Sequence, residues 1–221
     1  MSDVLIERLR MLDTASLSDA LDSLGVSGGL EGIVPRSDNY GLCGRAFTVE
    51  FGNPLEEEIK EAKAADYIDE VSQGEVVILA NNGRTDCTVW GGILTFLASM
   101  KGLGGTVIDG ACRDLEEVYE YNYPLYTKAV FMQTGKGRTK KRRHQVPVRI
   151  GGKEIFPGDY VRGDRNGVIV IPQVLIEETI RRAEAILDTE NKILDAVKNG
   201  ERLDVARKKY RYHRPWETNN M

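Results

Sequence analysis

Two short apolar runs with a glycine-bounded helix between them constrain the fold of this chain most. Residues 75–80 (EVVILA) and 106–108 (TVI) have the length and the β-branched content of buried strands. Between them, residues 91–105 (GGILTFLASMKGLGG) have the pattern of a helix that begins and ends at glycine, and residues 81–83 (NNG) are expected to form a loop. A strand, a helix and a second strand in this order predict a parallel pair, and therefore an α/β fold.

Shorter periodic segments on both sides of this unit predict the other elements. Helices are expected over residues 4–11, 16–24, 55–71, 114–120, 174–197 and 201–210, and strands over residues 41–51 and 129–132. Ser16 is expected to cap the second helix. Gly151 and Gly152 form the tight turn of a hairpin, and further short strands follow up to residue 171. This last part predicts an antiparallel meander before one long C-terminal helix.

The composition is that of one soluble globular domain. The chain has 221 residues, of which 41% are hydrophobic and 29% are charged, and its net charge is −4. The apolar content excludes a disordered chain, and the 23 glycines have no three-residue period, which excludes a collagen-like one. A single domain is expected over residues 1–221, with a core over about residues 10–175 and a C-terminal helix and tail over residues 174–221. An acidic chain disfavours nucleic acid as a partner, and the apolar runs are too short to cross a membrane.

The cysteines and the first residues predict a cytoplasmic location. Cys43, Cys87 and Cys112 form no CxxC pair and have no neighbouring histidine, a pattern typical of buried thiols in a reducing compartment. Residues 1–10 mix acids and bases and lack the basic-then-apolar order of a signal peptide.

Arg113 and Asp114 follow the second apolar run, and Glu117 comes three residues later. Positions i and i+3 share a helix face, so the two carboxylates can reach one cation or its water shell. Arg113 offers a planar fork of donors for a carboxylate or an oxyanion. Because the sequence has only two histidines, His144 and His213, oxygen ligands indicate Mg²⁺ or Mn²⁺ as the metal. The alternative is a surface Arg–Asp pair at the start of a helix.

Two other segments carry weaker signals. Gly91, Gly92, Ile93 and Leu94 begin a helix, where free N–H groups favour an anion, although glycine pairs also serve turns and packing. The basic segment Lys136 to His144 is expected to lie in an exposed loop, which is either solvated or in contact with RNA, phosphate or an acidic partner. The glycines at 102–105 precede a strand instead of a helix, which excludes the NAD fingerprint.

Four blocks of the sequence, taken in order, resemble the RraA-like family. They are TASLSDALDSLG at 14–25, WGGILTFLA at 90–98, GGTVIDGACRD at 104–114 and VPVRIGGKEIFPGDYVRGDRNGVIVIP at 146–172. The family includes the 4-hydroxy-4-methyl-2-oxoglutarate/4-carboxy-4-hydroxy-2-oxoadipate aldolases and proteins named regulators of ribonuclease E activity. Its signature is a Gly or Asp, twenty residues, Arg-Asp, and an acid three residues further on. Gly92, Arg113, Asp114 and Glu117 match this signature, although the characterised aldolases carry Asp at the position of Gly92.

The resemblance implies a β/β/α swivelling-domain fold with mixed sheets and a long C-terminal helix. It implies a homotrimer or homohexamer with the active site between subunits. The backbone amides at the start of one helix would hold the substrate; these are the amides of Gly91, Gly92, Ile93 and Leu94. Arg113 would bind the oxo acid, and Asp114 would bind Mg²⁺ largely through water, with Glu117 as a second acid beside the metal.

The implied activity is that of a class II, metal-dependent lyase that cleaves a C–C bond next to a 2-oxo acid through a pyruvate-type enolate. Its substrates would be compounds like 4-hydroxy-4-methyl-2-oxoglutarate, cleaved by retro-aldol reaction, or oxaloacetate, which is decarboxylated. Water is the candidate base, oriented by Glu117 or by an acid of a neighbouring subunit. One alternative is a non-catalytic regulator that binds a ribonuclease or another protein through the basic segment and the C-terminal helix. Another is a lyase or hydratase of the same fold that acts on a sugar acid.

Overall fold

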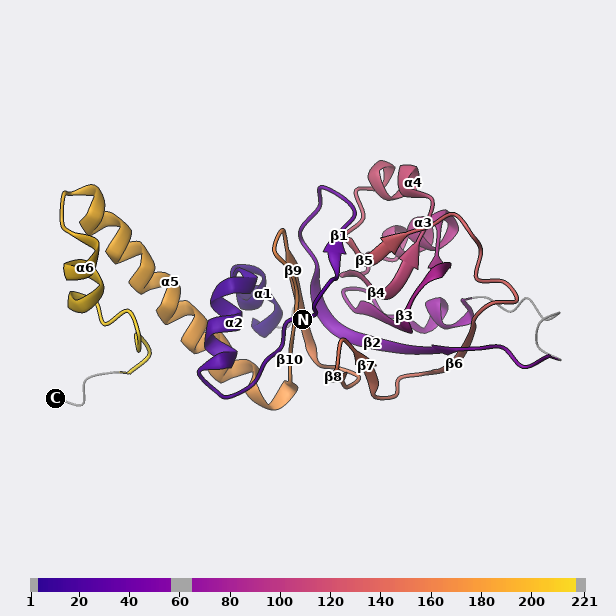
Figure 1. Ribbon diagram of the computed structural model, residues 1–221, viewed down its shortest axis with the longest axis horizontal. Coiled ribbons are helices and arrows are strands. Elements are labelled where there is room, and N and C mark those ends of the chain that lie inside the picture. The colour runs from indigo at the N-terminus through magenta and orange to yellow at the C-terminus, as the bar shows by residue number, and fades with distance from the viewer. Residues whose placement is uncertain (1–3, 57–64, 218–221) are drawn as a thin grey trace.

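The apolar runs of the sequence form the centre of a mixed sheet. β3 (Val76–Trp90) lies between β4 (Gly105–Cys112) and β2 (Cys43–Gly52) and is parallel to both strands. Every residue of β4 is buried, because both faces of the sheet are covered. The computed structural model describes residues 4–56 and 65–217, and it confirms the predicted strand–helix–strand unit (Figure 1).

The sheet extends on both sides of this unit. In the described part of the chain its order is β1–β5–β4–β3–β2–β9–β10, and β6 pairs with β2. The added strands are β1 (Val34–Pro35), β5 (Leu125–Val130), β6 (Lys140–His144), β9 (Tyr160–Asp164) and β10 (Gly167–Ile171). β7 (Val148–Ile150) and β8 (Lys153–Ile155) form a separate hairpin, in which Gly151 and Gly152 have φ of 57° and 80°. The predicted hairpin turn is confirmed. The single meander is wrong, because β9 pairs with β2 and leaves the β7–β8 hairpin on its own.

Helices and the separate hairpin cover the two faces of the sheet. On one face, α3 (Gly92–Met100) and α4 (Leu115–Glu120) pack with the 3-10 helix η2 (Asp66–Glu70) over β2, β3 and β4. On the other face, Ile150 and Ile155 of the hairpin pack against Ile78 and Val107. The helix predicted over residues 55–71 falls largely on residues 57–64, which lie outside the described residues; its described end is η2.

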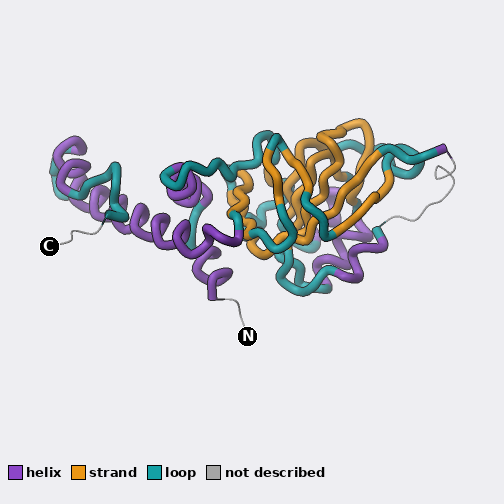
Figure 2. Tube along the Cα trace, turned by 90° about the horizontal axis from the view of Figure 1, so that it is seen from below, coloured by secondary structure: helices purple, strands orange, loops and turns teal. Residues whose placement is uncertain are grey.

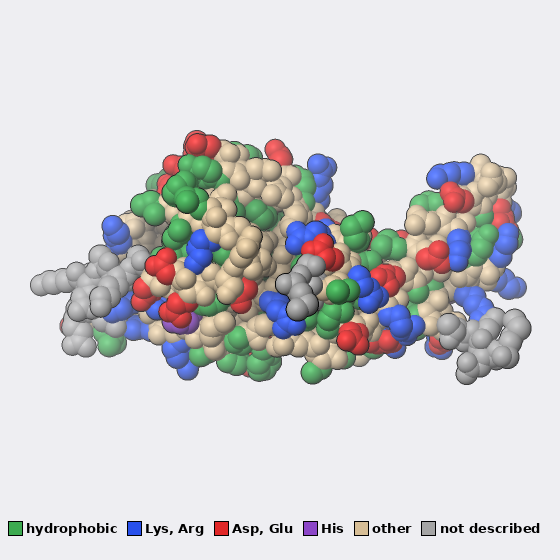
Figure 3. All heavy atoms as spheres, turned by 180° about the vertical axis from the view of Figure 1, so that it is seen from behind, with side chains coloured by type: hydrophobic (Ala, Val, Ile, Leu, Met, Phe, Trp, Pro, Cys, Tyr) green, Lys and Arg blue, Asp and Glu red, His purple; other side chains and the backbone are tan. Residues whose placement is uncertain are grey.

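A helical arm leaves the sheet at β10. α1 (Val4–Arg10) and α2 (Thr14–Asp22) pack against the first half of α5 (Ile176–Lys198), which follows the short 3-10 helix η3 (Gln173–Leu175). α6 (Leu203–Lys209) folds back on the far end of α5 through Ile193, Ala196 and Ala206. Figure 2 shows the strands gathered at one end of the molecule and this arm at the other, and Figure 3 shows acidic and basic side chains interspersed along it. None of the helices described is long and apolar enough to span a membrane.

The start of α2 differs from the prediction. Asp13 is the N-cap, and its carboxylate accepts the N–H of Ser16 at 2.7 Å, so the expected cap at Ser16 is wrong. Ser16 instead donates its hydroxyl to Asp13 at 3.0 Å. A carboxylate at this position also interacts favourably with the helix dipole, which a serine hydroxyl does less strongly.

Asp164, at the end of β9, holds α2 against the sheet. Its carboxylate accepts the N–H and the hydroxyl of Thr14, each at 2.8 Å, and the N–H of Asn166 at 2.8 Å. Burial raises the pKa of Asp164, but the hydrogen bonds from Thr14 and Asn166 outweigh it and hold the pKa below its usual value. The ionised carboxylate therefore stabilises the folded protein.

We expect Asp164→Ala to lower the free energy of unfolding by about 2 kcal/mol at neutral pH, because hydrogen bonds to a charged group are lost. A carboxylate with a depressed pKa stabilises the fold above its unfolded pKa of about 3.9, and this contribution disappears as the pH falls through the folded value. Urea unfolding of both proteins at decreasing pH measures the difference, which should shrink below about pH 4. A difference that stays constant down to about pH 2 would contradict this role of Asp164.

Candidate active site

The carboxyl ends of β3 and β4 meet at one edge of the sheet, beside a cavity of about 410 Å³. β3 ends at Trp90 and leads into α3, whereas β4 ends at Cys112 and leads through Arg113 and Asp114 into α4. Trp90 and Cys112 are paired across the two strands. Ligands commonly bind at this edge of parallel sheets. The fold therefore brings together the two segments that the sequence singled out.

The cavity has walls from several segments of the chain. Its lining residues are Phe51, Pro54, Ala65, Thr88, Val89, Trp90, Gly91, Gly92, Ile93, Leu94, Arg113, Asp114, Thr134, Gly135, Lys136, Gly137, Thr139, Lys140 and Lys141. The predicted site residues thus line one cavity, with the exception of Glu117, which lies behind Gly92.

Trp90 holds the start of α3 in place. Its side chain is 2% exposed and stacks on Tyr123, with ring centroids 6.0 Å apart. The indole Nε1 donates to Thr95 Oγ1 at 2.9 Å, and the same hydroxyl donates to the carbonyl oxygen of Gly91 at 3.2 Å. The backbone at Gly91 and Gly92 is therefore fixed by buried contacts before any ligand binds.

Asp114 joins the starts of α3 and α4. It precedes α4 with φ of 58° and ψ of 57°, a left-handed conformation that is uncommon for residues other than glycine. Its Oδ2 accepts the N–H of Gly92 at 2.9 Å and lies 3.4 Å from Nε of Arg113. Its Oδ1 has no hydrogen bond to any described residue, and the side chain is 39% exposed. One oxygen thus holds the site together, and the other is available to a ligand.

Glu117 lies against Gly92. A Cβ on Gly92 would lie 2.9 Å from Cδ of Glu117, and a Cβ on Gly91 would lie 2.6 Å from Oδ2 of Asp114. Side chains at 91 and 92 would therefore displace the two carboxylates. The space that a side chain would need at position 92 is filled by the carboxylate of Glu117, so glycine fits this position.

The backbone amides at the start of α3 are partly engaged. The N–H of Gly92 donates to Asp114, and the N–H of Leu94 donates to the carbonyl oxygen of Gly91 at 3.1 Å. The N–H of Ile93 donates to no residue in the described ranges. Among the amides at 92–94, the one at Ile93 is thus left for an anion.

The basic segment forms the opposite wall of the cavity. The prediction of an exposed loop is wrong for its second half, because β6 pairs with β2 and its charges are balanced by acids. Lys141 Nζ lies 2.7 Å from Asp66, Arg143 Nε lies 2.9 Å from Glu50, and His144 Nε2 lies 3.1 Å from Glu70. These acids are distant in sequence, and the run of cations alone could not reveal them.

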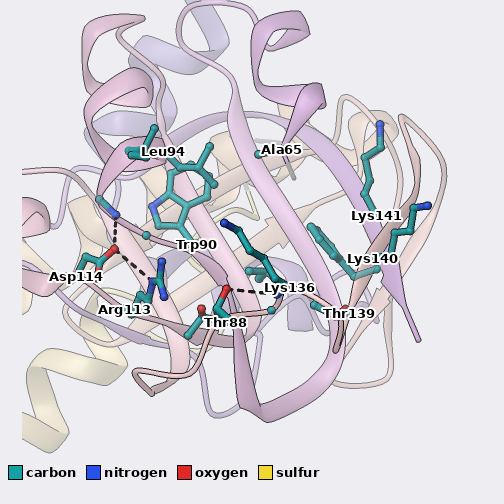
Figure 4. Close-up of a pocket in the computed structure, with 18 of the residues that line it drawn as sticks. Ala65, Thr88, Trp90, Leu94, Arg113, Asp114, Lys136, Thr139, Lys140 and Lys141 are labelled. Atoms are coloured by element: carbon teal, nitrogen blue, oxygen red, sulfur yellow. Dashed lines mark hydrogen bonds and ion pairs between the residues drawn. The ribbon is translucent and has the colours of Figure 1, made fainter. Parts of the chain in front are cut away.

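Lys136 is a functional candidate that the sequence analysis did not assign to the site. Its ammonium group points into the cavity toward Trp90, whereas Lys140 and Lys141 point away from it (Figure 4). No acid in the described part of the chain forms an ion pair with Lys136. Among the described lining residues, Arg113 and Lys136 therefore face the carboxylate of Asp114 with an excess of positive charge, which favours an anion in the cavity.

The carboxylates near Gly91 and Gly92 fit a hard cation. Mg²⁺ is usually bound through one or two carboxylates while water and substrate supply its other ligands. Asp114, with one oxygen available, and Glu117 provide this kind of donor. The described residues contain no group of three or more His, Cys, Asp or Glu side chains that could enclose a metal by themselves. Cys112 is not a candidate ligand, because it is buried and burial raises the pKa of its thiol.

Comparisons with known proteins agree with this architecture. A family model described as RraA-like, Aldolase/RraA, matches residues 14–170. The chain is 39% identical over 212 residues to Protein DlpA of Legionella pneumophila; the match covers 96% of this chain and 34% of that protein, so the chain spans about a third of its length. It is 32% identical over 108 residues to a 4-hydroxy-4-methyl-2-oxoglutarate aldolase of Thermus thermophilus, covering 48% of this chain and 64% of the aldolase.

The fold also matches a solved structure. An uncharacterized protein from Pseudomonas syringae pv. tomato is 43% identical and superimposes with a TM-score of 0.88 over 95% of both chains. The expected α/β fold with mixed sheets and a long C-terminal helix is therefore confirmed.

Proposed function

The chain belongs to the RraA-like family, and from this premise we propose that it is a metal-dependent carbon–carbon lyase acting on small 2-oxo acids. The observation that carries the proposal is the cavity at the ends of β3 and β4. There Arg113 and Lys136 provide positive charge, and Asp114 provides a carboxylate oxygen without a partner in the described residues. A cation site beside anion-binding groups suits a negatively charged oxo acid.

The proposed binding mode uses the chain's own groups. The N–H of Ile93 and the start of α3 receive the carboxylate next to the ketone, and Arg113 donates to the ketone oxygen. Lys136 receives a second carboxylate at the other end of the substrate. A bound Mg²⁺, held by Asp114 with Glu117 beside it, would supply Lewis acidity at the 2-oxo acid.

In the retro-aldol reaction, the C3–C4 bond of the substrate breaks and its electron pair forms an enolate of pyruvate. The hydroxyl at C4 loses its proton and becomes a carbonyl, and the enolate then takes a proton at C3. Arg113 stabilises the negative charge on the enolate oxygen. A water oriented by Glu117 or by an acid of a neighbouring subunit accepts the hydroxyl proton, because the described cavity wall contains no histidine. With oxaloacetate, the same bond cleavage releases CO₂.

The proposed assembly is a homo-oligomer, a trimer or a hexamer, with the cavity near a subunit boundary. On α3, Ile93 is 86% exposed, Phe96 45% and Met100 70%. Of these side chains, Ile93 also lines the cavity, and exposed apolar surface of this kind favours contact with another protein. The cytoplasmic location stays a prediction.

The first test is the release of pyruvate by the purified protein from 4-hydroxy-4-methyl-2-oxoglutarate and from oxaloacetate, followed with lactate dehydrogenase and NADH. We expect release above the metal-only background with Mg²⁺ and its loss with EDTA. Separate measurement of CO₂ distinguishes decarboxylation from retro-aldol cleavage. Release from neither compound, together with ribonuclease binding that EDTA leaves unchanged, would favour the alternative of a non-catalytic regulator.

A further inference from the structure

Asn81 lies outside the cavity but is connected to its basic wall. It is fully buried in β3, and its Oδ1 accepts the hydroxyl of Thr139 at 2.8 Å. Thr139 lines the cavity three residues after Lys136. We propose that Asn81 is a positioning residue, which holds the segment at 134–139 so that Lys136 points at the distal carboxylate of the substrate. This inference rests on the proposed function, because it assigns that carboxylate to Lys136.

The shape of β3 supports this role. The residues at 81–83, expected to form a loop, continue the strand irregularly: its register with β4 shifts between Ala80 and Arg84 and again before Thr88 and Trp90. Asn82 and Gly83 have φ of 54° and 67°, in the left-handed region. Irregularities of this kind re-aim side chains beside functional sites. Here the irregular part of β3 is the part that contacts the segment carrying Lys136.

Other contacts hold the same segment at both ends. The guanidinium group of Arg84 donates to the carbonyl oxygen of Arg138 at 2.5 Å. The N–H of Thr88 donates to the carbonyl oxygen of Gln133 at 3.0 Å, and Thr88 pairs with Thr134 in an isolated bridge. These contacts flank Lys136, and Asn81 adds the side-chain anchor from inside the sheet.

The packing at Gly135 and the burial of Asn81 bear on how the segment at 134–139 is held. A Cβ on Gly135 would overlap the carbonyl oxygen of Thr88, so the backbone approaches β3 as closely as glycine allows. Nδ2 of Asn81 is buried without a hydrogen-bond partner in the described residues. An unpaired buried donor is unfavourable, and an apolar side chain at this position would avoid it. The Asn81 side chain also interacts with the Cys87 thiol, and the bond from Thr139 is what joins it to the segment at 134–139.

The experiment compares two probes that differ in one carboxylate. Titration calorimetry with Mg²⁺ gives dissociation constants for pyruvate, which has one carboxylate, and for 2-oxoglutarate, which has two. Thr139→Val removes the hydroxyl bound by Asn81 and nearly keeps the side-chain shape. We expect Thr139→Val to raise the dissociation constant of 2-oxoglutarate about tenfold and that of pyruvate less than about twofold. Asn81→Leu is expected to act in the same way.

Lys136→Met gives the reference effect, an expected loss of about tenfold or more for 2-oxoglutarate with little change for pyruvate. Because Thr139 acts through Lys136, adding Thr139→Val to Lys136→Met should have no further effect. The matched control is Thr106→Val, which removes another buried hydroxyl. Thr106 lies at the end of β4 away from the cavity, and its Oγ1 is 2.9 Å from the Tyr123 hydroxyl. Thr106→Val should leave both dissociation constants unchanged.

The outcomes separate this inference from the proposed function. If Lys136→Met weakens the binding of 2-oxoglutarate but Thr139→Val and Asn81→Leu do not, the positioning role of Asn81 is overturned. The assignment of the distal carboxylate to Lys136 then stands. Equal weakening of both probes by Thr139→Val, or an additive double variant, would show a merely structural role and also overturn it. The positioning role is also overturned if Lys136→Met leaves the dissociation constant of 2-oxoglutarate unchanged, or if the wild-type protein binds neither probe. Pyruvate release decides the proposed function independently of all these results.

Discussion

Replacing Arg113 by methionine is expected to lower kcat for pyruvate release by about 10²–10³-fold. The guanidinium group lies in the cavity beside Asp114, where it can donate to the oxygen that becomes negative as the C–C bond breaks. An interaction that strengthens as charge develops lowers the barrier, so its loss appears in kcat more than in KM. Steady-state kinetics on the substrate that releases pyruvate measures both constants.

The control for this variant is Arg113→Lys, which keeps the charge but not the planar fork, and an intermediate loss is expected. The fold should be unaffected, because the side chain is 39% exposed and the backbone N–H of Arg113 still donates to Trp90. Thermal unfolding checks this point. An Arg113→Met variant that kept more than about a tenth of the wild-type kcat would remove Arg113 from the mechanism.

Asp114→Asn is expected to abolish the response of the reaction to Mg²⁺ and to reduce kcat about 10³-fold. Asparagine keeps an oxygen that can accept the N–H of Gly92, the contact that joins α3 to α4. It removes the negative charge that a divalent cation requires. Rates measured over a range of Mg²⁺ concentrations, with and without EDTA, report the change.

Glu116→Gln is the matched control, because Glu116 is an exposed carboxylate in the same turn of α4. It should leave the Mg²⁺ response unchanged. If Glu116→Gln and Asp114→Asn had equal effects, general loss of negative charge near α4 would explain the result, and the assignment of the metal to Asp114 would be wrong.

Much of the fold could be predicted from local patterns. The apolar runs at β3 and β4, the glycine-bounded α3 and the Gly151–Gly152 turn are signals within a few residues, and the structure confirms each of them. Local patterns likewise predicted that Arg113 and Asp114 follow the second apolar strand, β4, and the cavity lies at this end of the strand. Short-range geometry determines these features, and no contact distant in sequence is needed to predict them.

Other features depend on contacts between distant parts of the chain. β6 is a strand because it pairs with β2, and acids such as Glu50 and Asp66 balance its cations; neither β2 nor Asp66 is near it in sequence. Lys136 points into the cavity because β3 holds its segment from inside the sheet. The place of Glu117 against Gly92 likewise follows from the packing of α4 beside α3. Patterns within one segment could not reveal any of these.

Deuterium exchange tests most directly whether this cavity forms the enolate of pyruvate. Pyruvate is incubated with the protein in D₂O with Mg²⁺, and the methyl proton signal is followed by NMR. An enolate that is reprotonated by solvent replaces the methyl protons with deuterium, whichever physiological substrate the protein has. We predict exchange above the metal-only background that EDTA and Asp114→Asn abolish. Absence of exchange in a protein that binds pyruvate would contradict the formation of the enolate in this cavity.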